Sequence, residues 1–116
     1  MLKLQTPVTF APSRVSISLS DSTMILGSCF ADNIGSKMSE YGFNVCINPF
    51  GTLYNPVSVA NAVARLDSGI HFSEKDCVEM GAGAGLFCSF SHHTSFARPS
   101  AGQFLTDANS SLDEAR

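Results

Sequence analysis

The sequence predicts a fold of the α/β class, and a unit of strand, helix and strand near the start of the chain carries that prediction. The run TMIL, residues 23–26, is short and continuously apolar, as in a strand covered on both faces. A helix is indicated next, because four apolar side chains recur at helical spacing on one face: Phe30, Ile34, Met38 and Tyr41. The segment FNVCI, residues 43–47, alternates apolar and polar positions and predicts a second core strand. A right-handed crossover makes two such strands parallel.

Alternation and capping residues place two further elements around this unit. The segment RVSISLSD, residues 14–21, alternates strictly between apolar and polar positions, which predicts a half-buried strand. After the loop NPFGTLYNP, Asn55 is suited to cap a helix and Pro56 suits its first turn. We therefore expect a helix that runs from there to Gly69.

The second half of the chain contains shorter signals. SEKD, residues 73–76, resembles a capping box and predicts a short turn or helix. GAGAG, residues 81–85, lacks the spacing of a dinucleotide-binding loop and is predicted to be a flexible turn. LFCSF, residues 86–90, is an apolar strand candidate. A last helix, capped by Thr106, is predicted from the spacing of Leu105, Ala108, Leu112 and Ala115. Its pattern stops at Arg116 without a stop signal, which predicts a fragment of a longer domain.

Composition excludes several classes of partner and location. The 116 residues suffice for one small domain, and 44% of them are apolar. The formal net charge is −3, and no run of Lys and Arg provides a surface for nucleic acid. No stretch approaches the roughly 18 apolar residues of a membrane span, and no secretion signal is present at the N-terminus. We therefore expect a cytoplasmic protein with free thiols at its four irregularly spaced cysteines.

Two potential nucleophiles stand side by side in the segment GSCFA. Ser28 and Cys29 follow a predicted strand, and the predicted helix begins near Ala31. The N-terminus of a helix is electropositive, so it stabilises a thiolate and offers N–H donors to an oxyanion. Gly27 lets a ligand approach closely. This placement suits a covalent nucleophile, and the alternative is that Ser28 is only an N-cap and Cys29 only a small buried residue.

A pair of histidines forms the other distinctive feature. His92 and His93 lie between phenylalanines in SFSHHTSF, and either ring could position a substrate or act as a base near neutral pH. The alternative is that both are ordinary loop histidines. A metal site formed by Cys88 and the two histidines, with Cys29 or Cys77 as a fourth ligand, is a further alternative. The spacing is not that of a zinc site, so no metal and no cofactor are predicted.

Four segments in order give the chain a family resemblance: TPV (residues 6–8), ILGSCFADNIG, NPFGTLYNP and SFSHHTSF. With them the chain resembles the N-terminal portion of the GSCFA domain family, over most of its length. That family is grouped with the SGNH hydrolases, which are esterases and acyl-transferring enzymes. The resemblance implies the N-terminal part of a three-layer α/β/α domain with a flavodoxin-like parallel sheet.

The resemblance also implies roles for individual residues. The first SGNH block reads Gly-Asp-Ser, which places Gly27 on its glycine, Ser28 on the aspartate and Cys29 on the nucleophile. A shift of one residue would make Ser28 the nucleophile instead. The glycine N–H of the second block, an oxyanion donor, falls on Gly51. The amides of Asn48 and Asn55 lie nearby in the sequence.

Two departures, one from the SGNH pattern and one from the GSCFA family pattern, limit what the resemblance implies. The later blocks, Gly-x-Asn-Asp and Asp-x-x-His, have no match in this chain. A Trp-His pair expected before the histidine segment is replaced by Phe87 and Cys88. The sequence thus favours a hydrolase or acyltransferase that acts on a small ester or acyl substrate, for example an acylated carbohydrate. The alternatives are a non-catalytic binding domain for small molecules and an inactive fragment.

Overall fold

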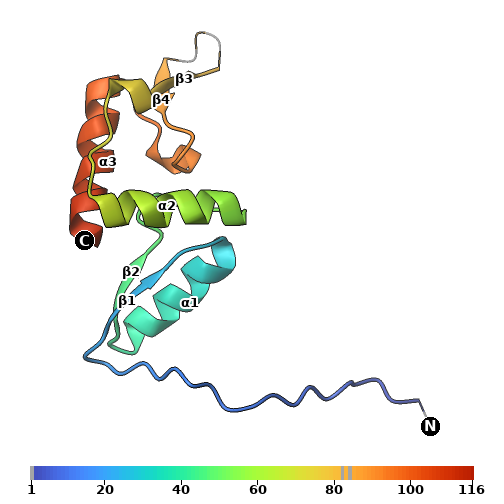
Figure 1. The fold of residues 1–116 in the computed structure, drawn as a ribbon. Helices are drawn as coiled ribbons and strands as arrows, with labels where there is room; N and C mark the ends of the chain where they lie inside the picture. Colours follow the sequence, from blue (N-terminus) through green and yellow to red (C-terminus); the bar gives the residue numbers. More distant parts are fainter. Residues whose placement is uncertain (1, 82, 84) are drawn as a thin grey trace.

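The computed structural model describes residues 2–81, 83 and 85–116, and its first unit is the predicted strand, helix and strand (Figure 1). Strand β1 (Ser22–Ile25) leads into helix α1 (Cys29–Glu40), which leads into strand β2 (Asn44–Ile47). The two strands pair in parallel, with Ile25 opposite Ile47. The α/β class and the parallel pair are therefore confirmed. Residues 22–47 are called the βαβ unit below.

Helix α1 packs on this sheet through its smallest residues. Ala31 and Gly35 are buried, and a Cβ added to Gly35 would collide with the side chain of Ile47. The predicted apolar face is wrong, because Phe30 is 73% exposed and Tyr41 is 76% exposed. Because Gly35 has no side chain, Ile47 can approach the helix backbone. This close contact orients the small residues, and not the large ones, toward the sheet.

The chain after β2 forms two helices, a hairpin and two short 3₁₀ turns, and α2 lies between the βαβ unit and the hairpin (Figure 1). Helix α2 (Pro56–Ser68) begins and ends where the sequence predicts, with Asn55 as its N-cap and Gly69 as a left-handed C-cap. Strands β3 (Val78–Met80) and β4 (Leu86–Cys88) pair in an antiparallel hairpin. The 3₁₀ turns are η1 (Glu74–Asp76), which has the expected capping box, and η2 (Thr94–Phe96).

Helix α3 (Ala101–Ala115) begins before the predicted cap. Ser100 is the N-cap, and its Oγ accepts a hydrogen bond from Gln103 N at 3.2 Å. Thr106 lies inside the helix, where its hydroxyl donates to the carbonyl of Gly102, so the prediction that it caps the helix is wrong. The predicted apolar spacing is confirmed, since Ala108 and Leu112 are fully buried.

The hydrophobic core lies between α2, α3 and the histidine segment. Phe50, Phe104 and Leu112 are the largest fully buried side chains. The buried cluster comprises Phe50, Leu53, Ala62, Leu66, Phe72, Cys88, Phe104, Ala108 and Leu112. We call this cluster, together with His92, the aromatic core. It is contributed mainly by the half of the molecule outside the βαβ unit.

The N-terminal segment does not form the predicted strand. Residues 14–21 contain no strand and Val15 is 74% exposed, because within the described residues no other strand pairs with this segment. The dark blue trace in Figure 1 runs away from the helices and strands. Of the turn predicted at residues 81–85, positions 82 and 84 lie outside the described residues. None of the helices in the described part of the chain has the length and apolarity that a membrane crossing requires.

Candidate active site

The turn from β1 to α1 presents both potential nucleophiles at the start of a helix. Ser28 is the N-cap and Cys29 is the first helical residue. The thiol of Cys29 is exposed, so the alternative that it is a small buried residue is wrong. Within the described residues, the side chain of Ser28 makes no capping hydrogen bond. The N–H groups of the first turn, which have no intrahelical partner, are therefore left without a side-chain cap.

Two hydrogen bonds through the side chain of Asn48 hold this turn in place. Gly27 N–H donates to Asn48 Oδ1 at 2.8 Å, and Asn48 Nδ2 donates to Asp32 Oδ1 at 2.6 Å. Asn48 is buried and has a φ of 42°, a left-handed conformation that asparagine tolerates better than most residues. The sequence alone did not predict this role of Asp32. An acid in the first turn of a helix was the one available signal.

Backbone hydrogen bonds tie the loop after β2 to the same turn. The N–H of Asn48 donates to the carbonyl of Ile25 at 2.9 Å, and the N–H of Leu53 donates to the carbonyl of Gly27 at 2.8 Å. The turn of residues 27–29, called the GSC turn, is therefore held in place by hydrogen bonds from residues 48 and 53. This explains how the segments GSCFA and NPFGTLYNP, which are distant in the sequence, come to share one site.

A cavity opens beside Ser28, between the starts of α1 and α2. Its volume is about 470 Å³, and it is shallow and widely open to solvent. Figure 1 shows the two helix starts close together at one side of the molecule. We call this cavity the Ser28 groove, and it is lined by Ser28, Leu53, Tyr54, Asn55, Pro56, Val59 and Ala60. The structure thus brings Ser28 and Asn55 together, whereas Cys29 is exposed next to the groove.

The loop that contains Gly51 bonds to the histidine segment, residues 89–96, and His93 lies beside Tyr54 of the groove. The N–H of Gly51 donates to the carbonyl of Asn48 at 2.8 Å, so in this conformation it bonds within a turn. His93 N–H donates to the carbonyl of Phe50, and its Nδ1 accepts from Ser95 N–H at 3.1 Å. The half-buried His93 ring lies 6.4 Å, centroid to centroid, from the ring of Tyr54, which lines the groove.

His92 lies in a different environment from its neighbour. It is only 8% exposed, and four phenylalanine rings surround its ring at centroid distances of 4.6 to 5.3 Å: Phe50, Phe72, Phe96 and Phe104. Its Nδ1 pairs with Ser89 Oγ at 2.7 Å, whereas Nε2 is buried with no partner among the described residues. Burial, assisted by the Arg65 charge, lowers its pKa to about 4. His92 is therefore a neutral core residue at pH 7.

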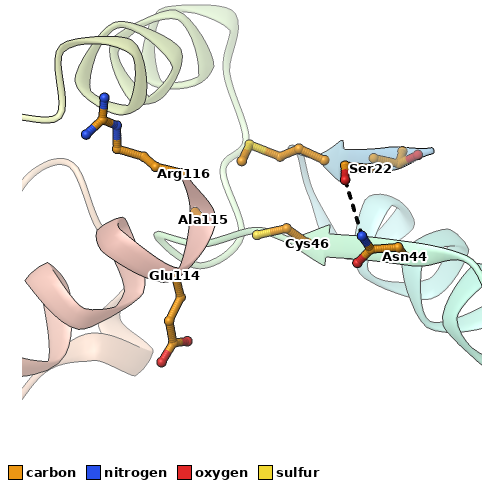
Figure 2. A pocket seen from close by; sticks show the side chains of 8 residues that line it. Ser22, Asn44, Cys46, Glu114, Ala115 and Arg116 are labelled. Carbon is orange, nitrogen blue, oxygen red and sulfur yellow. Dashed lines mark hydrogen bonds between the residues drawn. The ribbon is translucent and has the colours of Figure 1, made fainter. Parts of the chain in front are cut away.

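A separate cavity of about 350 Å³ lies between the β1–β2 sheet and the end of α3 (Figure 2). None of the candidate site residues lines it. Its thiol, Cys46, has a raised pKa, because it is partly buried and the Glu114 carboxylate is nearby. A raised pKa keeps the thiol protonated and unreactive. Within the described residues, no group of three His, Cys, Asp or Glu side chains gathers closely enough to hold a metal ion.

Comparison with known protein families identifies the family of this chain. The family model described as the GSCFA family matches residues 22–116. The segments GSCFA, NPFGTLYNP and SFSHHTSF all lie within the match, whereas the TPV triplet lies outside it. Comparisons with curated proteins and with solved structures gave no match.

Proposed function

Because the chain belongs to the GSCFA family, we propose that its GSC turn supplies the nucleophile of an ester hydrolase or acyltransferase. The thiolate of Cys29, or the hydroxyl of Ser28, attacks the acyl carbonyl of a small ester or thioester. A base takes the proton of the attacking thiol or hydroxyl and passes it to the leaving oxygen or sulfur, so that the tetrahedral oxyanion expels a neutral alcohol or thiol and leaves an acyl-enzyme. Water or a second alcohol takes the acyl group, and the nucleophile regains its proton.

The observation that supports this proposal most strongly is the uncapped start of α1 beside an open groove. Donors at a helix N-terminus stabilise an oxyanion, and here no side-chain cap occupies them. Cys29 is exposed and is intrinsically the better nucleophile. Ser28 has the better position, since it lines the groove itself. Both residues therefore enter the test.

His93 is the better of the two histidines for moving a proton at this site. It is half-buried and its ring lies beside Tyr54, which lines the Ser28 groove. His92 is enclosed by phenylalanines and is held neutral by its lowered pKa. Asn48 and Gly51 would act mainly by shaping the turn, because the Asn48 amide and the Gly51 N–H already bond within the protein.

Acylation by p-nitrophenyl esters tests the proposal directly. The full chain is incubated with the ester, the release of nitrophenol is followed, and the acylated residue is located by mass spectrometry. We expect an acyl adduct on residue 29 or 28, and a loss of about 10²-fold or more in acylation rate when that residue is replaced by alanine. Equal acylation of the wild-type chain and the Ser28→Ala/Cys29→Ala double variant would overturn the proposal.

A second function, a non-catalytic domain that binds small molecules, is favoured by a different observation. In the groove, the Asn55 side chain is committed to capping α2, and outside it the Gly51 N–H, the expected oxyanion donor, bonds within its own turn. In that case the double variant would retain ligand binding in calorimetry, and no acyl adduct would form on the wild-type chain.

A further inference from the structure

We propose that the Ser28 groove holds the acyl chain of the substrate, and that this chain is apolar and several carbons long. The inference rests on the proposed function and adds to it the substrate class. Five of the seven lining residues present carbon surface: Leu53, Tyr54, Pro56, Val59 and Ala60. No charged side chain lines the groove within the described part of the chain. A chain that buries carbon against such a wall gains affinity in proportion to the area that it removes from water.

The polar groups of the groove suit a ligand whose only polar part in the groove is its acyl carbonyl. Asn55 Oδ1 accepts from Ser58 N–H at 2.9 Å, and Asn55 Nδ2 donates to Ser58 Oγ, so this side chain is committed to capping α2. The hydroxyl of Ser28 has no such capping bond. A sugar ring would need several hydrogen-bond partners in the groove, whereas an acyl carbonyl needs a nucleophile and oxyanion donors. A carbohydrate part of the substrate would therefore lie outside the groove.

The groove wall is also firmly supported. Leu53 belongs to the aromatic core and Val59 packs against it, so the floor of the groove is continuous with the best packed part of the molecule. Ala60 is exposed on α2 and lines the groove with the smallest side chain of the seven. A larger side chain at residue 60 would therefore occupy part of the space that an acyl chain would use.

A pair of matched variants tests this inference. Ala60→Phe fills the groove, and Ala64→Phe adds the same ring at an exposed alanine one turn further along α2, outside the groove. Acylation rates are compared for acetyl and octanoyl esters of p-nitrophenol. We expect the octanoyl ester to acylate the wild type and Ala64→Phe about tenfold faster than the acetyl ester. The preference should disappear in Ala60→Phe. Circular dichroism and thermal unfolding confirm that both variants are folded.

Alkylation of Cys29 separates failure of this inference from failure of the proposed function. N-octylmaleimide and N-ethylmaleimide react with the exposed thiol without any acyl chemistry, and each rate is normalised to that of glutathione. An octyl preference that Ala60→Phe abolishes supports the groove as a site for an apolar chain, even if no ester acylates the protein and the proposed function fails. Acylation without any dependence on chain length, or the same preference in both phenylalanine variants, would overturn the inference and leave the proposed function standing.

Discussion

Helices α1 and α3 have similar apolar spacing but use it differently. Helix α3 buries Phe104, Ala108 and Leu112 completely in the aromatic core. Helix α1 exposes Phe30 and Tyr41 and contacts its sheet through Ala31 and Gly35. The N-termini of the two helices also differ. The side chain of Ser100 caps α3, whereas the side chain of Ser28 makes no capping hydrogen bond to α1.

This difference separates stability from chemistry within one small molecule. Most of the apolar burial that stabilises the fold lies in the aromatic core, away from the GSC turn. Within the described residues, no side chain caps the start of α1, where the two potential nucleophiles lie. Substitutions of the buried side chains of α3 should therefore change the free energy of unfolding, whereas substitutions of Ser28 and Cys29 should mainly change reactivity.

The largest expected effect comes from removing a core ring. Phe104→Ala should lower the free energy of unfolding by about 3–5 kcal/mol, because it leaves a cavity at a side chain with no exposure. The control is Phe30→Ala on α1, where the ring is mostly solvated and the change should stay within about 0.5 kcal/mol. Urea unfolding measures both. Equal losses would show that α1 contributes to the stability of the fold as much as α3 does.

The buried His92 makes the stability of the aromatic core depend on pH. Its pKa is lowered from 6.5 to about 4 by burial and the Arg65 charge, with Asp76 opposing the shift. Between these values the unfolded chain binds the proton and the folded chain does not, so stability falls as the pH drops from 6.5 to 4 and levels off below. This difference between the two pKa values corresponds to a loss of roughly 3 kcal/mol in the free energy of unfolding.

Unfolding curves collected across this pH range measure the effect. His92→Gln should reduce the fall in the free energy of unfolding between pH 6.5 and 4, called the acid limb, since the substituted side chain does not titrate in this range. His93→Gln is the matched control at the neighbouring position. An unchanged acid limb in His92→Gln would show that other groups govern the acid sensitivity.

Breaking the hydrogen-bonded chain behind the GSC turn should have an intermediate effect. Asp32→Ala removes the acceptor of the buried Asn48 amide, which should cost about 1–3 kcal/mol. We also expect a changed alkylation rate at Cys29, because the turn loses a support. Glu40→Ala, an exposed acid in the same helix, is the control and should change neither quantity. An alkylation rate equal to that of the wild type would argue against positioning by Asp32.

The smallest effect distinguishes the two serine N-caps. Ser100→Ala should destabilise the protein by about 1 kcal/mol, because it removes the hydrogen bond to Gln103 N–H. Ser28→Ala should cost only a few tenths of a kcal/mol, since no capping bond is lost. Thermal unfolding of the two variants measures the contrast. Equal losses of stability would mean that Ser28 caps α1 in solution. The N–H donors at the start of α1 would then not be free for a ligand.

Local patterns predicted the elements that depend on local chemistry. The runs around β1 and β2 and the capping pair at Asn55 and Pro56 were sufficient to place the parallel unit and α2. The alternation in residues 14–21 shows only that a strand would be amphipathic, and it cannot supply a partner strand. The face of α1 was missed because periodicity follows large side chains, whereas Gly35 and Ile47 pack by close approach.

The candidate site shows the same limit. The strand-to-helix position of Ser28 and Cys29 follows from neighbouring residues, and so it was predictable. The Asn48 bond to Asp32 joins residues of different elements, and no periodic signal marks it. Likewise, two adjacent histidines look alike in the sequence. Only the packing of distant phenylalanines separates the enclosed His92 from His93.

The close contact between Gly51 and His93 has a consequence for any mutational scan of this family motif. Residue 51 has a φ of 83°, and a Cβ there would collide with Cβ of His93. A methyl group at this corner would push the histidine segment outward and draw His92 out of its ring of phenylalanines. Gly51→Ala thus tests the packing of the loop around residue 51 against the histidine segment. Any loss of turnover in that variant would arise from this displaced loop, and not from a missing hydrogen-bond donor.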